Sequence, residues 1–144
     1  MNISVLVCDD SALMRKLISR IIDNAEDMSV VGTAMNGKFA LQKIPGLNPD
    51  VIILDLEMPQ MNGIEFLKER RKRRIDIPVV ILSSRAQRGA RITMDALNYG
   101  ASDFIMKPSG SISEDIHKIG EHIVETVRAY ALQYIKSKQK SSSS

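Results

Sequence analysis

The feature that most constrains the fold is a regular alternation of short apolar runs with segments of helical periodicity. The apolar runs are Ile3–Cys8, Val30–Thr33, Val51–Leu54, Val79–Leu82 and Asp103–Met106. Consecutive apolar positions in such short runs indicate strands that are covered on both faces, as in a parallel sheet. Strands that alternate with helices are typical of α/β folds, and we expect a doubly wound, five-stranded parallel sheet with helices on both faces.

The segments between these runs carry apolar residues at helical spacing, and residues typical of helix ends flank them. Ser11 stands where an N-cap is expected, and Pro45 with Gly46 is expected to end the second helix. The expected helices are 13–22, Gly37–Ile44, Ile64–Arg74, Arg88–Tyr99 and Ile112–Ile135. Each expected strand is thus followed by a helix, which predicts right-handed connections.

The length of 144 residues fits one domain with a reasonable core. We expect residues 1–128 to form this domain, and 129–144 to be the end of an extended last helix and a polar, Ser-rich linker or tail. No apolar stretch approaches the ~20 residues of a transmembrane helix, and Ile3–Cys8 is too short for a signal peptide. The single cysteine, Cys8, is expected to be buried in a strand and fits a reducing compartment. We therefore expect a cytoplasmic protein without a membrane partner.

The basic run from Arg70 to Arg74 supplies much of the formal net charge of +3. Such a run can bind nucleic acid, or it can be the solvated end of a helix, where the dipole favours cations. No aromatic residue interleaves the run. We therefore favour the helix terminus and expect no nucleic-acid partner.

Polar residues follow the expected strands at their carboxyl ends. Asp9 and Asp10 follow the first strand, Asp55 the third, Ser83 the fourth and Lys107 the fifth. In a doubly wound sheet these ends meet at one edge, in the crevice where ligands bind. Acidic residues at strand ends also serve as caps of turns and helices, so Asp9 and Asp10 alone would say little. The occurrence of all five polar positions at strand ends favours a functional site.

The chemistry of these residues points to a cation and a phosphoryl group. Neighbouring carboxylates repel one another, and Mg²⁺ relieves the repulsion because it binds a few oxygen ligands together with water and phosphate. Asp55 is at once a possible ligand and a possible nucleophile, since carboxylates can form aspartyl-phosphates. Lys107 and the Ser83 hydroxyl can both contact phosphoryl oxygens.

Three motifs resemble the response-regulator receiver family over about residues 3–127: Val7–Ser11, Asp55–Gly63, and Ser83-Ser84 followed by Lys107-Pro108. The resemblance implies a flavodoxin-like (CheY-like) fold with strand order 2-1-3-4-5, and phosphotransfer from a histidine kinase in the presence of Mg²⁺. It also implies a cis peptide bond between Lys107 and Pro108. Asn62 departs from the family, which more often has Asp there, and this should not affect phosphotransfer.

The resemblance also implies a role for each matching residue. Asp55 matches the phosphorylated aspartate, and Asp10, Asp55 and the backbone carbonyl of Glu57 match the direct metal ligands, with Asp9 acting through water. Ser83 and Phe104 match the two switch positions, and Lys107 matches the lysine that pairs with the phosphoryl group.

A narrower resemblance points to the regulatory half of the chemotaxis methylesterases, the CheB family. It rests on Asp10–Arg15, Val31–Ala34, Leu54–Pro59, Ser83-Ser84 and Lys107–Ser111. This resemblance implies a CheA-like histidine kinase as phosphodonor and a C-terminal esterase domain as output, which is absent from these 144 residues. His117 and His122 are five residues apart, so they do not share a helix face, and we expect surface residues without a catalytic role.

Two other functions remain open. A stand-alone receiver would act by phosphorylation-dependent binding of partners, with no esterase attached. An enzyme with an aspartate nucleophile would turn over phosphate esters, but such enzymes usually carry a second aspartate two residues further on, where this chain has Glu57.

Overall fold

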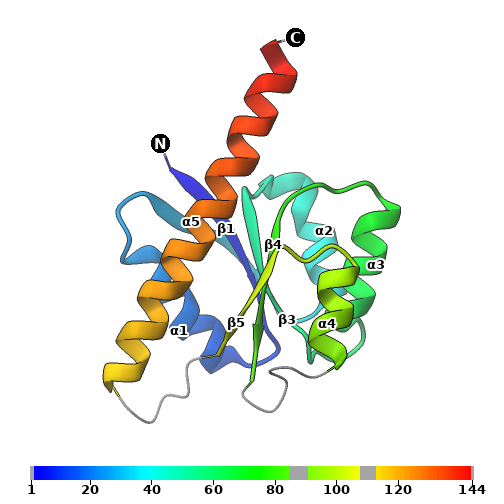
Figure 1. Cartoon of the computed structure of the whole chain (residues 1–144). Coiled ribbons are helices and arrows are strands. Elements are labelled where there is room, and N and C mark those ends of the chain that lie inside the picture. Colours follow the sequence, from blue (N-terminus) through cyan, green and yellow to red (C-terminus); the bar gives the residue numbers. More distant parts are fainter. Residues whose placement is uncertain (1, 85–90, 108–112, 144) are drawn as a thin grey trace.

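The computed structural model describes residues 2–84, 91–107 and 113–143, in which strands and helices alternate (Figure 1). The strands are β1 (Ile3–Cys8), β2 (Met28–Ala34), β3 (Val51–Asp55), β4 (Val79–Ser83) and β5 (Asp103–Met106). The helices are α1 (Ala12–Asp23), α2 (Gly37–Leu47), α3 (Gly63–Lys72), α4 (Arg91–Asn98) and α5 (Ser113–Ser143). The predicted alternation is therefore confirmed.

The strands form one parallel sheet in the order β2-β1-β3-β4-β5, as predicted. The chain moves outward from β1 to β2 and then crosses back to β3, so β1 has neighbours on both sides. The winding direction reverses between β1 and β3. A crevice forms at the carboxyl ends of strands at such a point, and ligands bind there.

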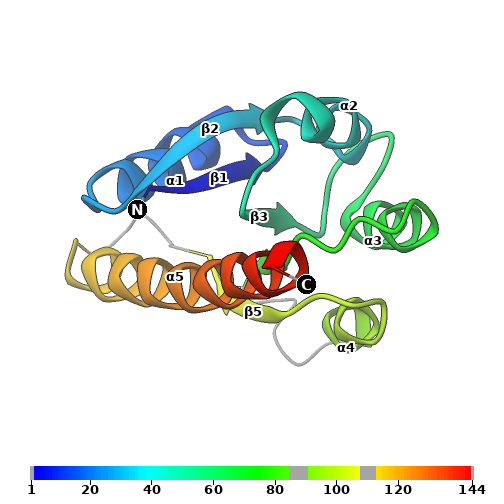
Figure 2. The same cartoon turned by 90° about the horizontal axis from the view of Figure 1, so that it is seen from above.

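Helices cover both faces of the sheet, with α1 and α5 on one side and α2, α3 and α4 on the other (Figures 1 and 2). Successive side chains of a strand point to opposite faces, and β1 shows this division. Val5 and Val7 pack in the cluster that includes α1 and α5 residues, whereas Leu6 and Cys8 pack in the opposite cluster. Cys8 is fully buried as predicted, and burial raises the pKa of its thiol well above the usual value.

Helix α1 begins as predicted, whereas α2 ends later than predicted. The Ser11 hydroxyl accepts a hydrogen bond from the Met14 amide at 3.2 Å, which is the expected N-cap. Helix α2 continues through Pro45 to Leu47, and Asn48 then adopts a left-handed conformation with φ of 45°. Proline removes one backbone hydrogen bond, but the last turn closes through the Asn48 amide, which donates to the carbonyl of Ile44 at 2.8 Å.

Helix α5 is longer than predicted, because it runs past Ile135 to Ser143. Its inner face buries Ile123, Val127 and Ala131. Beyond them the Tyr134 hydroxyl donates to Asp76 at 3.2 Å, and the rest of the helix projects past the edge of the sheet (Figure 1). The residues after Ile135, where the polar linker or tail was expected, therefore continue the helix as far as Ser143. The predicted first residues of the last two helices, Arg88 and Ile112, lie outside the described residues.

The basic run lies at the end of α3 and makes contacts within the fold. The Arg70 guanidinium donates to the Ile77 carbonyl at 2.7 and 3.0 Å, and Arg71 donates to the carbonyl of Asn98 at 3.0 Å. These bonds tie α3 to the segment that precedes β4 and to the end of α4. They agree with the helix-terminus interpretation of the run. In the described ranges, none of the helices combines the length and hydrophobicity that a transmembrane span requires.

Candidate functional site

The carboxyl edge of the sheet brings the predicted acidic residues together. Asp9 and Asp10 directly follow β1, and Asp55 is the last residue of β3. One carboxylate oxygen from each of these residues lies within 4.8 Å of the other two. Asp9 and Asp55 are buried and Asp10 is exposed, so the cluster opens toward solvent on the Asp10 side.

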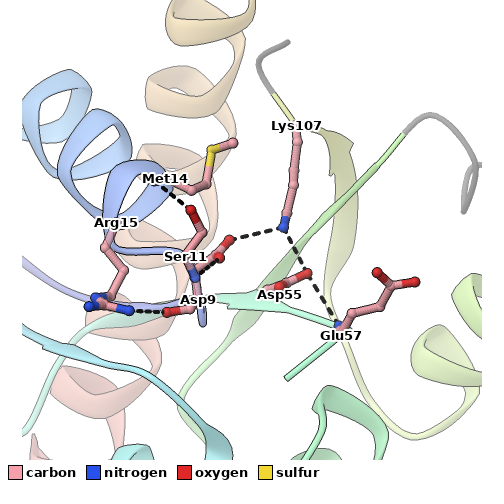
Figure 3. A network of polar contacts seen from close by, with 7 residues as sticks. All are labelled: Asp9, Ser11, Met14, Arg15, Asp55, Glu57 and Lys107. Atoms are coloured by element: carbon pink, nitrogen blue, oxygen red, sulfur yellow. Dashed lines mark hydrogen bonds and ion pairs between the residues drawn. The ribbon is translucent and has the colours of Figure 1, made fainter. Parts of the chain in front are cut away.

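Lys107, directly after β5, places its ammonium between two of the carboxylates (Figure 3). Its Nζ atom lies 3.0 Å from Oδ2 of Asp9 and 3.0 Å from Oδ1 of Asp55. Partial burial lowers the pKa of Lys107, but the hydrogen bonds and charges of Asp55 and Asp9 outweigh this effect and leave the pKa above its usual value. The lysine is therefore a fixed positive charge in the site.

The surroundings of Asp55 disfavour its ionised form. Burial and the charge of Asp9 raise its pKa to about 6, although Lys107 and the amide of Glu57 act in the opposite direction. The Glu57 amide donates to Oδ1 of Asp55 at 3.3 Å. The carboxylate is thus ionised above about pH 6 but stabilised less than in water, which favours the approach of a further cation.

Two buried oxygens at this edge have neither a hydrogen-bond nor an ion-pair partner among the described residues: Oδ2 of Asp55 and Oγ of Ser83, the last residue of β4. An unpaired buried polar atom costs about 1–3 kcal/mol. In native proteins such atoms often mark a catalytic role or the place of a bound water or ion. The carboxylate oxygens of Asp9, Asp10 and Asp55 form an all-oxygen ligand set, which suits a hard divalent cation. The Ser83 hydroxyl can instead donate a hydrogen bond to an oxygen of a bound anion.

The remaining residues named by the sequence analysis are Phe104, Pro108, His117 and His122. Phe104 is partly buried on β5 and packs against the core on the side of α2, α3 and α4. Pro108 lies outside the described residues, so the predicted cis bond to Lys107 does as well. His117 lies on the surface with Nε2 3.0 Å from Glu121 Oε1, and His122 is also exposed, which confirms their predicted surface positions.

Sequence reasoning missed the groups that hold the Asp9–Asp10 turn. The Ser11 amide donates to Oδ1 of Asp9 at 2.9 Å, and Arg15 Nη1 donates to the Asp9 carbonyl oxygen at 2.7 Å (Figure 3). Arg15 lies in the first turns of α1, from which a long side chain can reach back to the end of the preceding strand. The position of Arg15 near the start of the helix was the only sign in the sequence of its contact with the Asp9 carbonyl.

The loop after Asp55 is held by close backbone contacts. The Gly63 amide donates to the Leu56 carbonyl at 3.0 Å. A Cβ atom on Gly63 would lie 2.8 Å from the Leu56 Cα and 2.9 Å from the Asp55 carbonyl oxygen, so only glycine fits. Asn62, the residue that departs from the family pattern, caps α3 in a capping box with Glu65.

Comparisons with known proteins agree with this architecture. Residues 5–119 match the family model described as the response regulator receiver domain. The chain is 54% identical to the protein-glutamate methylesterase/protein-glutamine glutaminase of Treponema pallidum over 92% of this chain and 33% of that protein. It is 50% identical to the protein of the same name from Bacillus subtilis, over 90% of this chain and 36% of that protein. The chain thus spans about a third of the length of these relatives.

Solved structures give the same assignment. The response regulator domain of Thermotoga maritima CheB is 46% identical, with a TM-score of 0.81 over 91% of this chain and 97% of that chain. A structure of the P1 domain of CheA3 in complex with CheY6 from R. sphaeroides matches at 36% identity and a TM-score of 0.72, over 89% of this chain and 95% of that chain. The chain therefore belongs to the response-regulator receiver family and, within it, to the receiver domains of CheB-like proteins.

Proposed function

We propose that this receiver takes a phosphoryl group on Asp55 from a phosphohistidine of a CheA-like histidine kinase, with Mg²⁺ as cofactor. The observation that carries the proposal is the position of Lys107 between Asp9 and Asp55. Beside it lie two buried oxygens, on Asp55 and Ser83, that have no partner in the part of the chain that the structure describes. Cationic, acidic and hydroxyl groups thus surround one reactive carboxylate. A cytoplasmic location, where Mg²⁺ and phosphorylated kinases are present, follows from the proposal, which includes no nucleic-acid partner.

Each side chain has a defined task in the transfer. The Asp55 carboxylate forms a bond to phosphorus while the bond from phosphorus to the histidine nitrogen breaks and its electron pair stays with the imidazole. Lys107 neutralises charge on the phosphoryl oxygens, and the Ser83 hydroxyl donates a hydrogen bond to one of them. The direct metal ligands would be Asp10, Asp55 and the Glu57 carbonyl, and Asp9 would act through water. The bound ion would supply further charge neutralisation.

The first prediction concerns the site of modification. Incubation with acetyl phosphate and Mg²⁺ should add one phosphoryl group to the wild-type chain, and peptide mass spectrometry after borohydride reduction should place it on Asp55. The Asp55→Asn variant should remain unlabelled, because an amide is not a nucleophile toward phosphorus. Chelation of Mg²⁺ should reduce labelling of the wild type at least tenfold, since the metal neutralises charge in the transition state.

Asp95→Asn is a matched control, because Asp95 lies on α4 outside the acidic cluster. It should be labelled like the wild type. Labelling of Asp55→Asn at the wild-type level would contradict the assignment of Asp55.

We also propose that residues 1–128 are the regulatory domain of a protein-glutamate methylesterase, and that 129–144 connect it to the esterase. The support is the identity to curated methylesterases, of which the chain spans about a third. In such a parent, phosphorylation of Asp55 would release the esterase from an inhibited arrangement.

The second prediction tests this output in the full gene product. The reading frame should continue past Ser144 into an esterase domain, and acetyl phosphate should raise methylesterase activity of the whole protein severalfold. Asp55→Asn should abolish the increase and leave the basal activity intact. A stop codon after Ser144 would instead support the stand-alone receiver.

A further inference from the structure

Asp9 is fixed at its backbone as well as at its side chain. Its amide donates to the Ala34 carbonyl at 3.0 Å, and its carboxylate receives the Ser11 amide and the Lys107 ammonium. Its carbonyl oxygen receives Nη1 of Arg15 at 2.7 Å, the shortest of these contacts. Figure 3 shows Arg15 approaching the backbone of Asp9 and Lys107 approaching its carboxylate.

The neighbouring residue, Asp10, lacks such support. Its side chain is exposed, and no hydrogen bond to its carboxylate occurs among the described residues. The carbonyl of Asp9 and the amide nitrogen of Asp10 belong to one planar peptide unit. A hydrogen bond that fixes the direction of the Asp9 carbonyl therefore also fixes the direction in which the Asp10 backbone leaves the strand.

We propose that Arg15 is a positioning residue of the phosphoacceptor site, which holds the Asp9–Asp10 peptide so that Asp10 presents its carboxylate to the divalent cation. The inference rests on the proposed function, since it takes Asp10 as a metal ligand. Arg15 acts through the backbone and touches neither the cation nor the phosphoryl group. Nothing in the chemistry of the acidic cluster itself requires an arginine there.

The charge of Arg15 makes the proposal sharply testable. By Coulomb's law alone, removing a positive charge near three carboxylates strengthens the binding of a cation. Loss of positioning has the opposite effect, because Asp10 then samples directions that do not face the cation. The sign of the change in Mg²⁺ affinity therefore separates the two effects.

The experiment measures Mg²⁺ affinity by isothermal titration calorimetry, without any phosphodonor, for the wild type, Arg15→Met, Arg15→Lys and Lys16→Met. Lys16 is the exposed neighbour of Arg15 on α1, so Lys16→Met removes the same charge without the hydrogen bond. Thermal unfolding in the absence of Mg²⁺ verifies that each variant is folded at the titration temperature.

Arg15→Met should weaken Mg²⁺ binding roughly tenfold, as expected for loss of one charge-assisted hydrogen bond. Lys16→Met should bind as tightly as the wild type or slightly more tightly. Arg15→Lys, which keeps a donor of shorter reach, should recover part of the loss. The initial rate of phosphorylation at limiting Mg²⁺ should follow the same order.

Equal or tighter Mg²⁺ binding by Arg15→Met, or an equal loss in Lys16→Met, would overturn the positioning role while leaving the proposed function intact. A wild-type chain that binds no Mg²⁺ would overturn the proposed function itself, and the role of Arg15 with it. The two failures are therefore distinguishable.

Discussion

At the scale of single residues, the surroundings of Asp55 oppose the ionised form that its proposed role requires. It is 3% exposed, and it faces the charge of Asp9 across the cluster. The contact with Lys107 offsets this only in part, so the pKa of Asp55 lies at about 6. The proposed role as phosphoacceptor needs the ionised carboxylate, whereas the fold without a cation favours the neutral form more than water does.

This opposition predicts that Asp55→Asn stabilises the protein in the absence of Mg²⁺. The pKa of Asp55 in the folded state, about 6, lies above the ordinary value of 3.8. The protonated carboxyl therefore adds to the free energy of unfolding in full below about pH 4, and this contribution is lost as the pH rises through 6. An amide carries no charge to bury. At pH 7.5 the variant should therefore unfold at a higher temperature, by an amount corresponding to at most about 3 kcal/mol.

The measurement is thermal unfolding followed by circular dichroism between pH 4 and 8, without divalent cations. The difference between Asp55→Asn and the wild type should shrink toward zero at pH 4. Added Mg²⁺ should stabilise the wild type more than the variant, because the proposed metal site includes the Asp55 carboxylate and exists only in the folded state. A variant that is less stable than the wild type at pH 7.5 would contradict the argument.

The residues of the acidic cluster were predictable because of one geometric rule. The carboxyl ends of parallel strands carry Asp9, Asp10, Asp55 and Lys107. Such ends lie at one edge of the sheet however the side chains of the core pack. Arg15 was not predictable in the same way. Its contact depends on the angle at which α1 leaves β1 and on the reach of a flexible side chain, and local sequence specifies neither.

At the scale of elements, helix ends were the weakest predictions. Pro45 was expected to end α2, but it lies within the last turn, where the loss of one amide donor disturbs little of the helix. Helix α5 was expected to end near Ile135, but it continues to Ser143. Strand positions were predicted better, since burial on both faces leaves an unbroken apolar run in the sequence, as in Val51–Leu54.

Gly63 links the element scale to the site. Gly63→Ala should displace the loop that follows Asp55, because the new Cβ would overlap backbone atoms of Asp55 and Leu56, which have no flexible end to move away. We expect a loss of stability of about 2–3 kcal/mol, and phosphorylation at least several-fold slower. The measurements are chemical unfolding and the initial rate of labelling by acetyl phosphate.

Gly46→Ala is the matched control, since no atom of the described residues lies within 4 Å of a Cβ at Gly46, near the end of α2. It should be neutral or slightly stabilising, because alanine has the higher helix propensity. Equal effects of the two substitutions would show that the close approach at Gly63 has no special importance.

At the scale of the whole molecule, the parallel sheet connects the site to one outer face. Ser83 pairs with Met106 across β4 and β5, and Phe104 lies on the same strand as Met106. We propose that the Ser83 hydroxyl turns toward the phosphoryl group, that Phe104 moves with it, and that the face formed by α4, β5 and α5 changes. Within residues 2–84, 91–107 and 113–143 the Ser83 Oγ has no hydrogen-bond partner, so its rotation breaks no bond there.

Beryllofluoride with Mg²⁺, a mimic of the phosphoryl group, should therefore shift amide resonances of Phe104 and of α4 in the wild type. Ser83→Ala should still bind the mimic at Asp55, but the distant shifts should be reduced by more than half, because the linking hydroxyl is gone. Heteronuclear NMR titrations measure both effects. Shifts confined to residues 9–10 and 55–57 in the wild type would rule out the switch.

The buried cysteine has a practical consequence for following such a switch. Cys8 is the only cysteine of the chain, it is 1% exposed, and its thiol resists deprotonation. Since thiolates are the species that react with maleimides and spin-label reagents, the native protein should be nearly inert to them. Cysteines introduced on exposed positions of α4 and α5 would then be the only reactive ones, so pairs of probes could report the distance between these helices without any change to the native core.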